Sequence, residues 1–185
     1  MQFLGMIIRQ GEIKMDGRKL EAIEKWNPPT SVKGIWLFTG FANFYQKFIP
    51  DFSNIVAPLN LLTHKGKPWV WTQLQQCSFE CLKHIFSSAP LLRIPDVTHP
   101  FSIITDASLL AAGAVLMQED ENSNLYPCVY FSCTFSSAQH NYDIYNHELL
   151  AVILALKEWH QYLQGTTHPI TIITNHKNLS YIKDP

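Results

Sequence analysis

The sequence predicts an α/β protein, mixed α+β overall, in which a small helical unit with a short β-hairpin precedes a mixed β-sheet. Apolar residues recur at helical spacing through most of residues 16–90, as amphipathic helices require. Residues 101–135 instead hold three short apolar runs separated by polar segments of turn length, and a long helical pattern and a fourth apolar run follow. Three strands joined by short loops are expected to be antiparallel, and a crossover helix then leads to a parallel fourth strand.

Turn and proline signals divide the first half of the chain into short elements. Two strands are expected around Gly11, and Asn27 with the two prolines after it ends the next helix. Thr30 or Ser31 can cap a further helix, which stops at Pro50. The expected elements are strands within residues 2–16, helices over 16–26, 30–49, 52–63 and 74–90, and an exposed basic linker at 64–68.

Two of these helices carry side chains that invite a functional interpretation. Aromatic residues recur along the helix before Pro50, and we interpret them as core packing rather than as a platform for nucleic-acid bases. They are Phe38, Phe41, Tyr45 and Phe48. In the helix over 74–90, Cys77, Cys81 and His84 share one side, but structural zinc requires four ligands. We therefore interpret these three as packing and surface residues.

The second half is expected to form the mixed sheet. Its strands are predicted at 101–105, 113–118, 128–135 and 169–175, with a long helix over 146–163 and another helix beginning within 178–184. The long helix is expected to turn Leu149, Val152, Leu156 and Trp159 inward.

Polar residues interrupt this apolar framework at equivalent places. Asp106 ends the first strand, Asn175 ends the fourth, and Glu148 lies in the first turn of the predicted long helix. If the first and fourth strands are neighbours, all three converge on one edge of the sheet, where open α/β folds place ligands. Taken singly, an Asp after a strand, such as Asp106, is more often a turn or cap residue, and Glu148 near a helix start is what the helix dipole favours.

Composition bounds the class of protein. With 185 residues, 46% hydrophobic and 16% charged, the chain suits one or two compact soluble units rather than a disordered segment. Its longest apolar runs are too short to span a bilayer, and its first residues lack the features of a signal peptide, so we expect no membrane partner and a cytoplasmic or nuclear location. Four loosely spaced cysteines indicate no disulfide framework.

Charge is distributed unevenly along the chain. Residues 1–68 hold nine lysines and arginines against five acids, a net charge of +4, whereas residues 69–185 hold five against ten, a net charge of −5. The first part suits a polyanion and the second could hold cations. Solvated faces with a chance imbalance explain the same counts equally well.

Several sequence motifs of the chain resemble those of a known family. The RNase H domain of Gypsy-class, sushi-like LTR retrotransposon Pol proteins is matched by FSIITDASLLAAGAVLMQ, CVYFSCTFSSAQHNYDIYNHELLAVILALKEWHQYLQG and TIITNHKNLSYI. The sequence before these motifs resembles the end of the reverse-transcriptase palm, its thumb and a tether. The resemblance covers essentially the whole chain and implies palm end and thumb at 1–66, a tether at 67–97 and an RNase H-like domain, C-terminally truncated, at 98–185.

The resemblance also implies a chemistry. RNase H uses carboxylates to hold two Mg²⁺ ions that cleave the RNA strand of an RNA/DNA hybrid, and such hard cations require anionic oxygen ligands. Asp106 and Glu148 match the first two metal ligands, whereas Asn175 stands at the third, within the family's TDHKNL pattern. A fourth carboxylate would follow Pro185. We therefore expect weak or absent nuclease activity, and no polymerase activity, because no Tyr-x-Asp-Asp turn occurs.

Basic residues are candidates for contacts with the nucleic-acid backbone, although each alone is equally an ordinary surface residue. The candidates are Lys14, Lys19, Lys33, Lys47, His176 and Lys177. Elsewhere the grip on phosphates is thinner than the resemblance implies, because uncharged or weakly basic residues replace the usual Arg or Lys. These departures are at Cys133, Thr134, His140 and His147.

Three interpretations remain open. The chain is an enzyme fragment completed by further Pol polypeptide, a non-catalytic module that binds nucleic acid or another partner in a decayed or host-adopted copy, or an open-reading-frame remnant without a role. Asn175 and the thinned basic positions favour the second and third over an active enzyme.

Overall fold

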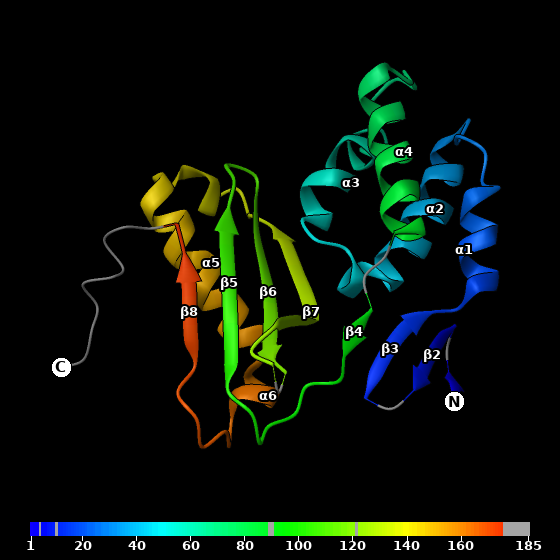
Figure 1. Ribbon diagram of the computed structural model, residues 1–185. Helices are drawn as coiled ribbons and strands as arrows, with labels where there is room; N and C mark the ends of the chain where they lie inside the picture. Colours follow the sequence, from blue (N-terminus) through cyan, green and yellow to red (C-terminus); the bar gives the residue numbers. More distant parts are fainter. Residues whose placement is uncertain (4, 10, 89–90, 121, 176–185) are drawn as a thin grey trace.

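Two β-sheets and the helices around them make up the computed structural model, which describes residues 1–3, 5–9, 11–88, 91–120 and 122–175 (Figure 1). The first sheet has the order β1-β2-β3-β4 and the second the order β7-β6-β5-β8. The strands are β1 (Gln2–Phe3), β2 (Met6–Arg9), β3 (Glu12–Met15), β4 (Leu92–Arg93), β5 (Phe101–Ala107), β6 (Ala111–Glu119), β7 (Leu125–Thr134) and β8 (Thr171–Thr174). The helices are α1 (Gly17–Glu24), α2 (Val32–Phe44), α3 (Phe52–Leu61), α4 (Gln73–Ser87), α5 (Ile144–Glu158) and α6 (His160–Leu163), with 3₁₀ turns η1 (Gln46–Phe48) and η2 (Gln139–Asn141).

The predicted hairpin is confirmed, but its sheet is larger than expected. β2 and β3 pair antiparallel, with Ile8 opposite Ile13. Two short strands that the sequence does not reveal, β1 and β4, extend the sheet on either side. Leu92 of β4 pairs with Ile13 of β3, which returns the chain after α4 to the N-terminal hairpin.

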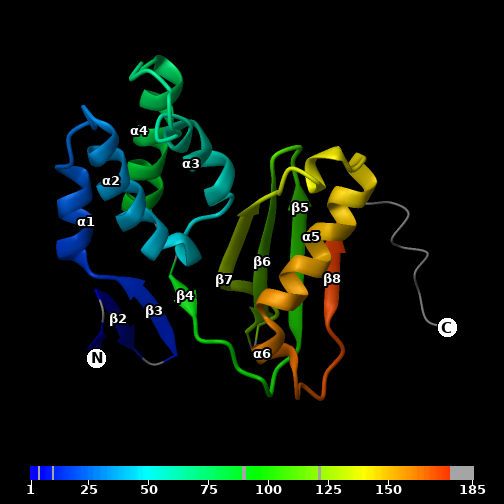
Figure 2. The ribbon, with the colours of Figure 1, turned by 180° about the vertical axis from the view of Figure 1, so that it is seen from behind.

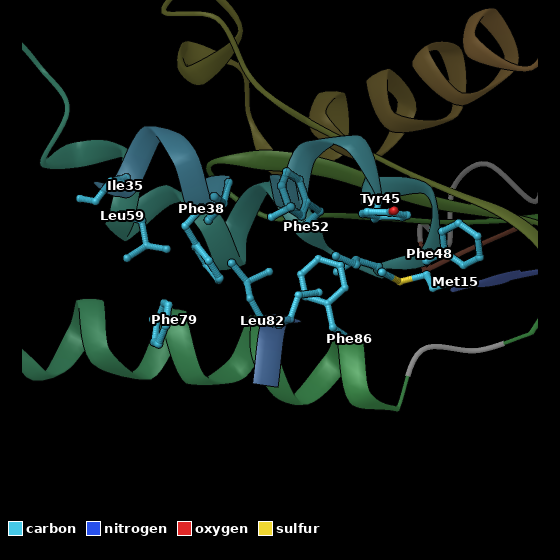
Figure 3. Packing of buried hydrophobic residues seen from close by; sticks show 14 of the residues in the cluster. Met15, Ile35, Phe38, Tyr45, Phe48, Phe52, Leu59, Phe79, Leu82 and Phe86 are labelled. Atoms are coloured by element: carbon cyan, nitrogen blue, oxygen red, sulfur yellow. The ribbon is translucent and has the colours of Figure 1, made fainter. Parts of the chain in front are cut away.

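The aromatic stripe of α2 forms the core of the helical unit, as interpreted from the sequence. Phe38 is fully buried, and its ring centroid lies 4.6 Å from that of Phe79 on α4 (Figure 3). The helix ends earlier than predicted, at Phe44, where the cap residue Tyr45 leaves helical geometry with φ −103° and ψ 13°. The 3₁₀ turn η1 follows and stops at Ile49, whose extended angles of φ −116° and ψ 113° are typical of a residue before proline.

A capping box starts α4, which covers the other side of this core. The Thr72 side chain accepts from the backbone of the first turn and the Gln75 side chain accepts from the Thr72 N–H, an arrangement that satisfies otherwise unpaired helix-end groups. The predicted apolar face of α4 is confirmed, because Phe79, Leu82 and Phe86 are all buried. Cys77 and Cys81 are exposed on the opposite side.

The second unit is the predicted mixed sheet covered by α5. β5 pairs antiparallel with β6 and parallel with β8, and α5 lies across one face (Figures 1 and 2). The predicted orientation of Leu149 is wrong, since its side chain is 37% exposed. Small residues, Ala151 and Ala155, face the sheet instead and let the helix approach closely. The predicted helix within 178–184 lies outside the described residues.

Contacts join the two units directly. α3 and η1 lie against β7, and α3 also contacts β6. The Ser53 backbone N–H donates to Ser132 Oγ at 3.0 Å, and Ser108 Oγ donates to Asn54 Oδ1 at 3.1 Å. Within the described part of the chain, no helix is long and apolar enough to cross a bilayer.

Candidate functional site

Three predicted site residues lie at the carboxyl end of the parallel pair β5 and β8. Thr105 and Thr174 are the last paired residues of these strands, and Asp106 and Asn175 follow them directly. Glu148 reaches this end from α5, where its Oε2 accepts from Thr174 Oγ1 at 3.4 Å. The α5 helix begins at Ile144, so Glu148 lies in its second turn and not, as predicted, in its first. The structure thus places the three positions at one end of the sheet, while their role stays a prediction.

Burial distinguishes the two carboxylates. Glu148 on α5 is only 9% exposed, whereas Asp106 is exposed. Asp106 alternates with the buried Thr105 along β5, so its side chain leaves the sheet on the face opposite α5. Side chains on that face line a pocket shared with the start of α3 in the helical unit.

A pocket of about 350 Å³ at this junction contains Asp106 together with a carboxylate that the sequence analysis missed. Asp51 occupies the N-cap position of α3 in a left-handed conformation with φ 51°, and its Oδ1 accepts from the Asn54 side chain (Nδ2) at 2.7 Å instead of from a backbone N–H. Burial raises the pKa of Asp51; the Asn54 hydrogen bond opposes this effect and the negative charge of Asp106 adds to it. An Asp before an apolar helix signals a cap, but no local pattern reveals that it will face a strand far along the chain.

The donor set at the end of β5 and β8 does not fit a pair of Mg²⁺ ions. Two carboxylates, Asp106 and Glu148, and one neutral amide, Asn175, would have to balance two divalent cations close together. Among the residues that the structure describes, no three His, Cys, Asp or Glu side chains gather where a metal ion could be held.

The predicted lysine contacts divide between surfaces. Lys14 on β3 and Lys19 on α1 are exposed, as are Lys33 on α2 and Lys47 on η1, whereas His176 and Lys177 lie outside the described residues. Helical spacing within α2 gathers Lys33 and several apolar residues into an exposed stripe, and exposed Lys47 follows in η1. The stripe, here called the α2 stripe, consists of Lys33, Trp36, Leu37, Gly40, Phe44 and Lys47.

His140 and His147, which stand where the family usually has Arg or Lys, contact backbone carbonyls of neighbouring loops. His147 is fully buried, stacks on Phe135 at 4.6 Å and places Nε2 2.7 Å from the carbonyl of Gln139. His140 places Nδ1 3.0 Å from the Leu109 carbonyl, next to the β5–β6 turn. Because His147 is fully buried, it offers no contact to a phosphate in this chain.

Comparison with known proteins agrees with this fold. Residues 71–172 match the family described as the RNase H-like domain found in reverse transcriptase. The Transposon Tf2-3 and Tf2-4 polyproteins of Schizosaccharomyces pombe are each 36% identical over 179 residues, which cover 97% of this chain. The chain spans only 13% of the length of these relatives. They confirm the resemblance to retrotransposon Pol proteins.

Solved structures show the same architecture at lower identity. The foamy viral protease-reverse transcriptase in complex with dsDNA has a TM-score of 0.77 at 22% identity, covering all of this chain and 39% of that one. The same type of enzyme in complex with an RNA/DNA hybrid has a TM-score of 0.74 at 23% identity, covering 93% of this chain and 23% of that one. With the sheet order, the two joined units and the sequence matches together, the chain belongs to the family of RNase H-like domains found in reverse transcriptases.

Proposed function

We propose that this chain binds duplex nucleic acid, such as an RNA/DNA hybrid, as part of a Pol polyprotein, and that it contributes little RNase H catalysis of its own. The α2 stripe carries the binding proposal. Asn175 carries the proposal of weak catalysis.

The α2 stripe combines charge with exposed apolar surface. Trp36 is 60% exposed and Phe44 47% exposed, and Lys33 and Lys47 stand at the two ends. The helix has 13 residues and so extends about 20 Å at roughly 1.5 Å per residue. Lysines at this separation can neutralise phosphates while the apolar side chains between them lie against sugars and base edges.

Two further features suit a polyanion. No Asp or Glu occurs in α2 or η1, so no carboxylate of these elements opposes phosphate binding. Gly40, in the middle of the stripe, has no side chain, and the space where a Cβ would stand is open, so a ligand can approach the helix backbone there. The related foamy viral enzymes in complex with dsDNA and with an RNA/DNA hybrid support the choice of ligand.

Charge reversal in the α2 stripe tests the binding proposal. Lys33→Glu should weaken binding of a fluorescein-labelled RNA/DNA hybrid severalfold in an anisotropy titration and reduce the salt dependence by about one phosphate contact. Lys157→Glu on α5 makes the same change in net charge away from the stripe and is the matched control. Equal losses for the two variants would show a general charge effect and overturn the proposal.

Catalysis is limited by charge at the third ligand position. Asn175 keeps the shape of an aspartate but removes one negative charge from a site that would balance two divalent ions. Loss of a residue that merely supports a metal ligand typically costs about 10- to 100-fold in affinity or activity, so loss of a ligand should cost more. An active nuclease is the second candidate function, favoured by the placement of Asp106 and Glu148 at one sheet end.

A further inference from the structure

The connection between α3 and α4 forms a second exposed surface, separate from the α2 stripe, that holds lysines and a tryptophan. Residues 64–70 are all exposed, and they lie at the end of the helical unit away from both sheets (Figures 1 and 2). The Lys67 N–H donates to the His64 carbonyl at 3.2 Å, and Gly66 has φ +81°, a left-handed conformation that favours glycine. A tight turn therefore precedes the sequence Trp69-Val70-Trp71.

The two tryptophans of this connection form a fixed aromatic platform. Their rings stack with centroids 6.0 Å apart and planes inclined by 22°. Two residues of α4 hold Trp71 in place: its Nε1–H donates to Gln76 Oε1 at 2.8 Å, and its ring meets that of Phe79 edge-on, with the ring centroids 6.3 Å apart. Trp69 rests on this anchored ring and keeps 36% of its surface exposed. The contact with Trp71 favours this orientation of the Trp69 ring before a ligand binds, which reduces the entropy lost on binding.

Positive charge flanks the platform. Lys65 and Lys67 lie within four residues of Trp69 and are exposed. In the described ranges neither forms an ion pair, since the ion pairs found there are Arg18–Asp16 and His99–Asp96. An exposed indole beside two unpaired ammonium groups offers stacking and phosphate neutralisation at once.

We propose that this platform binds an unpaired stretch of nucleic acid, with a base stacked on Trp69 and the adjoining phosphates at Lys65 and Lys67. Aromatic stacking with a basic groove is how proteins hold single strands without reading sequence, because every base has a π-face. Bases inside a duplex are already stacked on one another, so the platform favours a single strand over a blunt duplex. The inference deepens the proposed function, since it assigns an unpaired strand to the same nucleic-acid ligand.

The test compares two probes on the full chain. Anisotropy titrations use a labelled oligothymidine and a labelled blunt duplex, with Trp69→Ala, Trp69→Phe and, as the matched control, Val70→Ala on the neighbouring exposed residue. Trp69→Ala should weaken oligothymidine binding about tenfold and leave blunt-duplex binding within about a factor of two. Trp69→Phe retains an aromatic face and should keep most of the affinity, and Val70→Ala should change neither.

Several outcomes overturn the inference. Unchanged oligothymidine binding in Trp69→Ala, an equal loss for both probes, or an equal loss in Val70→Ala would each exclude a single-strand platform at Trp69. A folding defect is separated from a lost contact by circular dichroism and by the Trp69→Phe variant. If Trp69→Ala weakens oligothymidine binding while Lys33→Glu leaves duplex binding unchanged, the single-strand platform is supported and the proposed duplex binding is refuted. If Lys33→Glu weakens duplex binding while Trp69→Ala leaves oligothymidine binding unchanged, only the platform is refuted.

Discussion

Truncation of Phe38 tests the orientation of α2, on which the outward position of the α2 stripe depends. Phe38 is fully buried, and its ring meets Trp26 edge-on at 5.6 Å and Phe79 at 4.6 Å. Removing a buried phenylalanine side chain typically costs about 3–5 kcal/mol, a range that includes the cavity left behind. Aromatic pairs contribute about 0.5–1.5 kcal/mol each beyond the area buried, so Phe38→Ala should fall in the upper part of that range.

Trp36→Ala on the same helix is the matched control. Trp36 is 60% exposed, so its truncation should change the free energy of unfolding by no more than about 0.5 kcal/mol. Urea denaturation followed by far-ultraviolet circular dichroism measures both. A loss of about 4 kcal/mol lowers the urea midpoint by about 2 M at a typical slope of about 2 kcal/mol per molar. Equal losses in the two variants, or a larger loss for Trp36→Ala, would refute the assigned face of α2 and with it the α2 stripe.

Three further predictions concern the junction and the thiols. Ser132→Ala removes the acceptor of the Ser53 N–H and should cost about 1–3 kcal/mol, measured as a lower melting temperature, whereas an unchanged melting temperature would show that this junction bond is dispensable. Burial raises the pKa of Cys128 to about 11, so Cys128 stays a thiol at pH 8 and should resist alkylation by iodoacetamide, whereas exposed Cys77 should be alkylated. Equal labelling of the two cysteines, measured by mass spectrometry, would contradict this prediction. Burial also raises the pKa of Asp51 above 3.8, so the contribution of this carboxyl to stability is present below pH 3.8 and is lost as the pH rises through the folded pKa. Asp51→Asn removes the charge that is unfavourable at high pH and should therefore raise the melting temperature at pH 7 more than at pH 3. The opposite order would refute the assignment.

The sequence predicts the second sheet well because its signals are local and repeated. Apolar runs bounded by turns mark β5, β6 and β7, and one long helix before another apolar run requires a parallel crossover. β1 and β4 escape prediction, because two-residue strands have no period and are stabilised by partners distant in the chain.

The inward face of α5 shows where periodicity fails. Residues 149–156 are apolar on all sides, so several faces satisfy a helical pattern and packing against the sheet chooses among them. The choice falls on Ala151 and Ala155 rather than Leu149, because small side chains allow close contact with the strands.

The candidate site is predictable to the same extent. Strand ends locate Asp106 and Asn175, because parallel neighbouring strands bring their carboxyl ends to one edge. Asp51 and Asn54 could not be placed near Asp106 from sequence, since the hydrogen bond between Asn54 and Ser108 joins residues 54 positions apart. Only tertiary docking of α3 on the sheet creates that pocket.

Cleavage of an RNA/DNA hybrid in the presence of Mg²⁺ tests the central claim most directly. The wild-type chain, with neutral Asn175 at the third ligand position, should release no more product than the Asp106→Asn variant, and Asn175→Asp should bind Mg²⁺ more tightly than wild type in a calorimetric titration. Wild-type turnover near the enzyme median of about 10 s⁻¹, abolished by Asp106→Asn, would contradict the claim that a missing charge silences this nuclease.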